Sequence, residues 1–133
     1  MPFYQWNQEF LTVKVDAMDH EHQILIDKMN KLFDAYKGHK PRQEIETYLT
    51  DFVNYTLTHF HDEEAYMEKI AFAGLATHKI IHKQLLGQVT GYVEEFRRTG
   101  EFTEAFFDFL SVWLTSHIRG IDTKYSAKQS KVA

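Results

Sequence analysis

Residues 75–98 read LATHKIIHKQLLGQVTGYVEEFRR, and this stretch decides the fold class. Apolar and histidine side chains recur in it every three or four residues, at Leu75, His78, His82, Leu85, Val89, Tyr92 and Phe96. This interval places side chains on one face of an α-helix, whereas a half-buried strand would alternate every second residue. The stretch therefore predicts a long helix whose buried face carries two histidines.

Three further stretches have helical periodicity, and no segment alternates convincingly as a strand. We expect these helices over about Asp19–Lys37, Pro41–Ile70 and Thr103–Arg119. Glycine and proline mark the joints between the helices, at Gly38, Pro41, Gly74 and Gly100. Short connections favour antiparallel neighbours, so the sequence predicts an all-α, up-down-up-down four-helix bundle.

The length of 133 residues fits one domain over residues 1–133. We expect an irregular arm over about residues 1–18, packed on the bundle through apolar residues such as Trp6 and Phe10. The polar residues from about 126 to 133 predict a frayed tail.

Composition excludes several classes of protein. With no cysteine, neither a disulfide scaffold nor a thiolate metal site is possible. A formal charge of −4 with scattered Lys and Arg disfavours nucleic acid as a partner. No apolar run approaches the ~20 residues that span a bilayer, and the first residues do not resemble a signal peptide. We therefore expect a cytoplasmic protein with no membrane insertion.

Five histidines and two carboxylates have the spacing of helical metal ligands: His22, His59, Glu63, His78, His82, His117 and Asp122. Within two pairs, His59 with Glu63 and His78 with His82, the residues are four apart and share one helix face. Those faces are also the apolar faces, so both pairs point into the predicted core. Burying this set without a metal would cost several kcal/mol in unpaired polar groups.

The histidines also lie at one depth of the predicted bundle. The separations from the helix ends are 16, 16, 16 and 14 residues, for His22 to Gly38, Gln43 to His59, His82 to Arg98 and Thr103 to His117. At 1.5 Å per residue, each histidine lies roughly 21–24 Å from its loop. Because both hairpins turn at the same end, the sequence predicts one site that can hold two metal ions.

His117 and Asp122 are five residues apart, which is about 140° around a regular helix. We therefore expect the helix to tighten, widen or end between them, with Gly120 supplying the freedom. The other three histidines, His20, His39 and His61, are expected in solvent.

The spacing of these residues resembles the hemerythrin family in its single-domain bacterial form. The matching motifs are Asp19-x-x-His22, His59-Phe60-x-x-Glu63-Glu64-x-x-Met67, His78-x3-His82 and Trp113-Leu114-x-x-His117-Ile118-x3-Asp122-x-x-Tyr125. The resemblance covers nearly the whole chain, and all seven ligand positions are filled.

The resemblance implies a non-haem di-iron centre with a bridging oxo or hydroxo group. Glu63 and Asp122 would bridge the irons, with three histidines on one iron (His78, His82 and His117) and two on the other (His22 and His59). One coordination position would then stay open on the His22/His59 iron, where O₂ binds. The matching pocket residues are Leu25, Phe60, Trp113, Leu114 and Ile118.

The expected function is reversible O₂ binding for storage or delivery, without enzymatic activity. Carboxylate-rich di-iron enzymes use four carboxylates and two histidines, whereas imidazole dominates here. The alternatives are a di-iron redox enzyme of peroxidase or nitric-oxide type, and a sensor of O₂ or redox state. Asp19, Asp62 and Glu64 are candidate acceptors for imidazole N–H groups, Asp62 being the more exposed. We expect a monomer; an oxygen-receiving partner protein is not identifiable.

Overall fold

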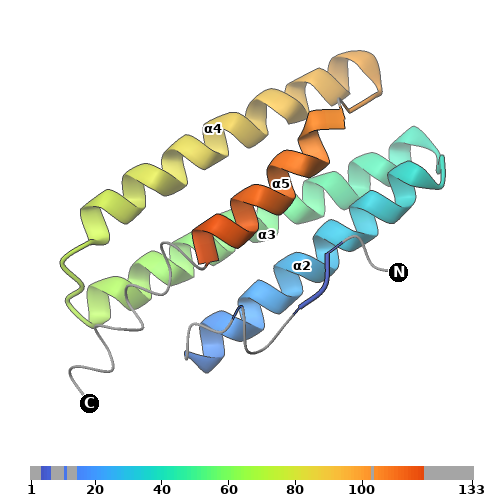
Figure 1. Cartoon of the computed structure of the whole chain (residues 1–133). Helices are drawn as coiled ribbons and strands as arrows, with labels where there is room; N and C mark the ends of the chain where they lie inside the picture. Colours follow the sequence, from blue (N-terminus) through green and yellow to red (C-terminus); the bar gives the residue numbers. More distant parts are fainter. Residues whose placement is uncertain (1–3, 7–10, 12–14, 103, 119–133) are drawn as a thin grey trace. The chain divides into compact units, whose positions relative to one another are not determined.

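The computed structural model describes residues 4–6, 11, 15–102 and 104–118. Its helices are α2 (Asp16–Lys37), α3 (Arg42–Lys69), α4 (Leu75–Thr99) and α5 (Glu104–Ser116), as Figure 1 shows. No described residue lies in a strand. The chain forms two compact units, residues 1–61 and 62–133, and the division falls inside α3. The expectation of one domain over residues 1–133 stays a prediction.

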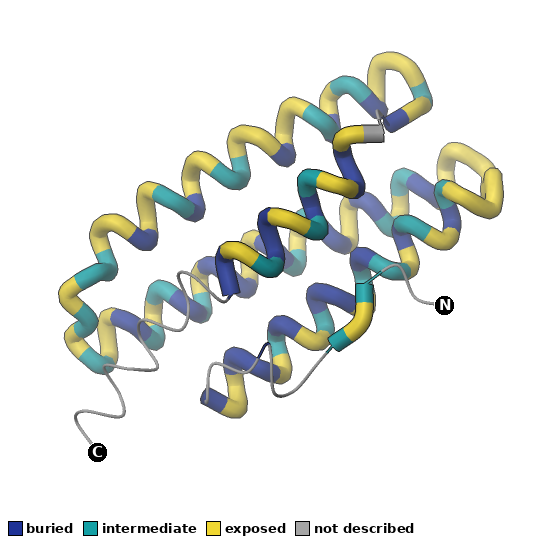
Figure 2. The backbone as a smooth tube through the Cα atoms, viewed as in Figure 1, coloured by how far each residue is buried: buried dark blue, intermediate teal, exposed yellow. Residues whose placement is uncertain are grey.

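The first unit is an antiparallel hairpin of α2 and the first part of α3 (Figure 1). Buried and exposed residues alternate around both helices (Figure 2). The buried apolar residues of this hairpin include Leu25, Met29, Leu32, Leu49 and Phe52. At its edge Lys28 Nζ donates to Asp51 Oδ2 over 2.7 Å, and this salt bridge links the two helices.

Helix α2 begins three residues earlier than the sequence predicted, so Asp16–Met18 belong to the helix and not to the arm. Val15 is the N-cap, and its carbonyl accepts from the amide of Asp19 over 2.9 Å. Two carboxylates, Asp16 and Asp19, lie in the first turn, where the helix dipole favours negative charge. Of the expected arm, Tyr4–Trp6 have no regular structure.

The second unit contains the end of α3, then α4 and α5, with consecutive helices antiparallel (Figure 1). Aromatic rings fill the α4–α5 turn: the ring centroid of Phe102 lies 4.5 Å from those of Phe96 and Phe106, both stacked. Such pairs contribute about 0.5–1.5 kcal/mol each beyond their buried area. This cluster fixes how α5 starts against α4.

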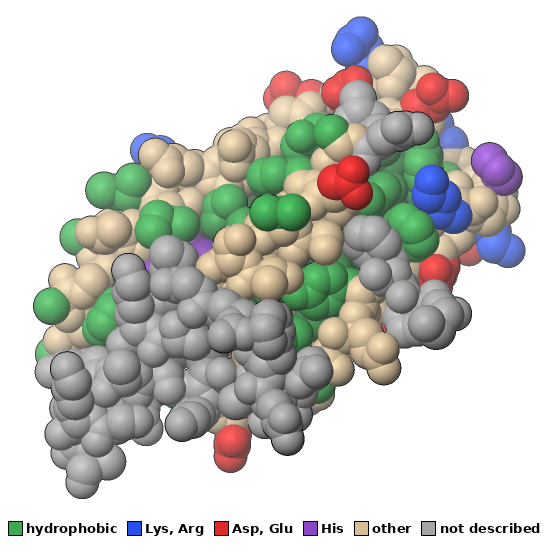
Figure 3. Space-filling model, viewed as in Figure 1, with side chains coloured by type: hydrophobic (Ala, Val, Ile, Leu, Met, Phe, Trp, Pro, Cys, Tyr) green, Lys and Arg blue, Asp and Glu red, His purple; other side chains and the backbone are tan. Residues whose placement is uncertain are grey.

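The charged surface agrees with the sequence. On the face in Figure 3, the Lys and Arg side chains of the described residues are scattered and interleaved with acidic ones. Within the described part of the chain, no helix is sufficiently long and apolar to cross a membrane.

Glycine at position 100 is required by the backbone that ends α4. Gly100 has φ 80°, in the left-handed region, and its amide donates to Phe96 O over 2.7 Å. We expect Gly100→Ala to lower the free energy of unfolding by about 1–2 kcal/mol, measured by denaturant titration. Gly91 is the matched control, because a Cβ there meets nothing within 4 Å. Gly91→Ala should raise stability by about 0.5–1 kcal/mol. Equal effects of the two variants would contradict this account of the α4 terminus.

Candidate metal centre

Three imidazoles converge on one buried carboxylate in the second unit. The Nε2 atoms of the three histidines lie 3.1, 2.9 and 3.4 Å from Glu63 Oε1, for His78, His82 and His117 respectively. Helix α3 supplies the carboxylate, α4 supplies two imidazoles, and the third follows the end of α5. All four residues are buried, and their ligand atoms lie within 4.8 Å of one another.

The hydrogen bond on the outer nitrogen of His82 shows that this cluster fits a cation. His82 Nδ1 donates to Glu64 Oε2 over 2.9 Å, since a carboxylate only accepts. A neutral imidazole then presents a lone pair on Nε2, which faces Glu63 Oε1 at 2.9 Å and His117 Nε2 at 3.2 Å. Because two acceptors at this distance repel, the arrangement calls for a cation between them, a proton or a metal ion.

A second group of imidazoles lies in the first unit. His22 on α2 and His59 on α3 are buried, with ring centroids 4.7 Å apart and ligand nitrogens within 4.8 Å of one another. His59 Nδ1 donates to Glu21 Oε1 over 2.8 Å. His59 therefore also turns its Nε2 lone pair away from its carboxylate partner.

Helix α3 links the two groups along the chain. It is continuous from Arg42 to Lys69 and carries both His59 and Glu63. Residues four apart lie on one helix face, separated by about 6 Å of rise. One helical turn therefore separates a member of the first group from the carboxylate of the second.

The structure describes six of the seven predicted ligands and brings them into these two groups. Asp122, with Gly120 and Tyr125, lies outside the described residues, and the full ligand set stays a prediction. The backbone becomes π-helical at His117 and Ile118, directly after α5. The expected widening of the helix therefore begins at His117, earlier than its predicted α-helical end at Arg119.

The residues around the ligands divide as the sequence suggested. The predicted pocket side chains are all buried: Leu25, Phe60, Trp113, Leu114 and Ile118. The Trp113 ring lies 6.3 Å from that of His117, centroid to centroid. The three histidines expected in solvent, His20, His39 and His61, are exposed.

Among the carboxylates near the imidazoles, Glu64 accepts from a ligand histidine as expected. Asp19 is buried, and Asp62 is only half-buried. Sequence reasoning missed Glu21. It is adjacent to His22, and neighbours on a helix point about 100° apart, which suggested a solvated side chain. Its proximity to His59 becomes visible only when α2 and α3 are paired.

Burial raises the pKa of Tyr66, which lies three residues after Glu63 on α3. The raised pKa keeps the phenol protonated at neutral pH, because a buried phenolate loses hydration. Tyr66 is therefore a hydrogen-bonding group and not a phenolate ligand.

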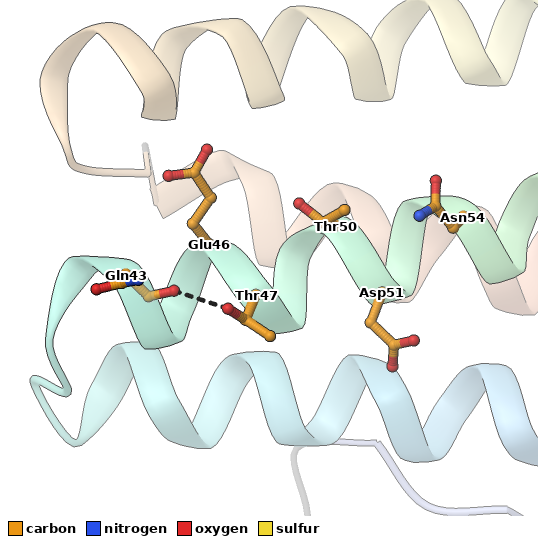
Figure 4. Close-up of a pocket in the computed structure, with 6 residues that line it drawn as sticks. All are labelled: Gln43, Glu46, Thr47, Thr50, Asp51 and Asn54. Atoms are coloured by element: carbon orange, nitrogen blue, oxygen red, sulfur yellow. Dashed lines mark hydrogen bonds between the residues drawn. The ribbon is translucent and has the colours of Figure 1, made fainter.

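A polar groove along α3 contains none of the ligands. Figure 4 shows its lining residues: Gln43, Glu46, Thr47, Thr50, Asp51 and Asn54. Thr47 Oγ1 donates back to Gln43 O over 3.0 Å, and Asp51 pairs with Lys28. Because these contacts stay within the hairpin and the side chains are mostly exposed, the groove is a solvated helix face.

Comparison with known proteins gives one consistent result. The family model Hemerythrin HHE cation binding domain matches residues 13–128. A bacteriohemerythrin of Stenotrophomonas maltophilia is 30% identical over 119 residues, 90% of this chain and 77% of the relative. A myohemerythrin of Riftia pachyptila is 32% identical over 92% of this chain and 90% of its own length.

The fold comparison agrees with the sequence relatives. A crystal structure of wild-type hemerythrin superposes with a TM-score of 0.86 at 28% identity, over 96% of this chain and 98% of that chain. The predicted fold class, an all-α four-helix bundle, is thereby confirmed.

His82 provides the direct test of the cluster. We expect His82→Ala to lower the amount of tightly bound metal per chain by at least half, because it removes one ligand and frees Glu64. Elemental analysis after desalting measures this. His61→Ala is the control, since that imidazole is exposed; its metal content should equal that of the unmodified chain. An undiminished metal content in His82→Ala would contradict the cluster as a metal site.

Proposed function

The chain belongs to the hemerythrin family, and we propose that it binds O₂ reversibly at a non-haem di-iron centre, for oxygen storage or delivery. The observation that carries the proposal is the convergence of three imidazole nitrogens on Glu63 Oε1. Family membership supports iron as the metal, and a set of imidazoles with carboxylates suits it.

We propose that one iron is held by the three histidines of the second unit and the other by His22 and His59. Glu63 and Asp122 would serve both irons. The arrangement of lone pairs supports this division, because His59 and His82 each donate Nδ1–H outward and keep Nε2 for a cation. When bound, the two irons supply the two electrons with which O₂ is held and returned.

The protein's own contribution is to hold the ligands and to keep water away. Leu114 is 1% exposed and lies on α5, one turn before His117. An apolar groove between α4 and α5 also ends at His117, lined by side chains such as Leu85, Phe109 and Val112. Apolar walls disfavour entry of water and protons, which would promote loss of reduced oxygen from the site.

The balance of ligands supports a carrier and not an enzyme. Five imidazoles and two carboxylates place less negative charge on the metals than the four carboxylates of di-iron oxygen-activating bundles. Less anionic charge stabilises high-valent iron less, and this favours binding of O₂ over cleavage of its O–O bond.

Reversibility is the property that separates a carrier from the alternatives. Ferrous protein prepared without air should contain two irons per chain and develop a visible charge-transfer band on exposure to air. Purging with argon should remove the band over repeated cycles. A single irreversible conversion to ferric protein would contradict the carrier function and favour redox chemistry.

Leu114→Ala should keep both irons but shorten the lifetime of the oxygenated form several-fold, because truncation opens space for water beside the site. Decay of the charge-transfer band in air measures this. Leu110→Ala is the matched control: Leu110 is also buried on α5, one turn earlier. Both variants should lose about 2–5 kcal/mol of stability, but only Leu114→Ala should oxidise faster. An unchanged lifetime would rule out this role of Leu114.

A further inference from the structure

We propose that Glu21 is a positioning residue for the iron held by His22 and His59, and that it sets how firmly this iron is retained and how readily it is oxidised. The inference rests on the proposed function and extends it to a residue outside the predicted ligand set. Its basis is the contact of Glu21 Oε1 with His59 Nδ1 at 2.8 Å.

The contact has the geometry and surroundings of a strong hydrogen bond. His59 is 1% exposed and the Glu21 side chain 17%, so the imidazole is dry while the carboxylate keeps an edge in water. A charge-assisted N–H···O bond of this length is about twice as strong as a neutral one. The carboxylate therefore fixes both the tautomer and the rotation of the ring, with Nε2 turned inward.

The same arrangement recurs in the other unit. Glu64 Oε2 accepts from His82 Nδ1 over 2.9 Å, and the Glu64 side chain is 26% exposed. In both cases the acceptor directly follows or precedes a predicted ligand, in Glu21-His22 and Glu63-Glu64. Neighbours on a helix point about 100° apart, so one faces the centre and the other reaches a histidine on the next helix. Each pair thus supplies a ligand and orients another.

Two consequences follow for the His59 side of the centre. An anionic acceptor on Nδ1 raises the basicity of Nε2, which strengthens the bond to a cation. A more basic ligand also stabilises ferric over ferrous iron, so Glu21 lowers the reduction potential. Removing the charge of Glu21 should therefore weaken metal retention and raise the potential.

The experiment compares the iron-loaded full chain with Glu21→Gln and Glu21→Ala. Glutamine can still accept from Nδ1 but carries no charge, whereas alanine removes both. We expect iron release to a ferrous chelator to be about 10-fold faster in Glu21→Gln and up to about 100-fold faster in Glu21→Ala. Spectroelectrochemical titration should show a raised reduction potential in both variants. Circular dichroism checks that both remain folded.

Asp27→Asn is the matched control, because it removes one negative charge from the same helix at an exposed position beside Lys31. Its iron release and potential should equal those of the unmodified chain. A rise of the potential in Asp27→Asn equal to that in Glu21→Gln would overturn the proposal, since net charge alone would explain it. Unchanged release and potential in both Glu21 variants would also overturn it.

The two proposals fail in different ways. If the unmodified chain takes up two irons and binds O₂ reversibly while the Glu21 variants behave identically, only the positioning role is wrong. If the unmodified chain does not bind O₂ reversibly, the proposed function is wrong. If it retains no iron, the role of Glu21 falls with it.

Discussion

The constraint on which the structure depends is the burial of the Glu63 carboxylate. A buried anion is tolerated only where positive charge or hydrogen-bond donors surround it, because dehydration costs several kcal/mol. Around Glu63 three imidazoles from two other segments fill this role. They in turn need a cation, since the lone pair of His82 Nε2 faces the carboxylate. The second unit is therefore organised by a polar cluster that is complete only with a bound cation.

Two backbone features serve this cluster. Helix α3 runs without interruption through His59 and Glu63, so the spacing between the two ligand groups is set by the helix itself. After α5 the backbone changes to π-helical geometry at His117. Such widenings are rare and are often found at functional sites, because they turn a side chain that a regular helix would aim elsewhere.

Carboxylates outside the ligand groups extend this organisation to the surface. Glu21 and Glu64 each bind the outer nitrogen of one ligand histidine and keep an edge in water. Nearer the centre, the pocket side chains such as Leu114 are apolar and buried. A dry interior bounded by oriented imidazoles suits a site that has to bind a small neutral molecule and release it unchanged. Membership of the hemerythrin family supports the same function.

The sequence by itself determined the helices and the grouping of the ligands. The three-and-four spacing of residues such as His78 and His82 is a local property of one helix, and connection lengths then set the depth of each histidine. Tertiary structure alone decided the rest. Helix α2 starts at Asp16 because Val15 caps it, and Glu21 serves the site because α3 brings His59 beside it. Contacts between helices depend on how two faces pack, and no spacing within a single helix contains that information.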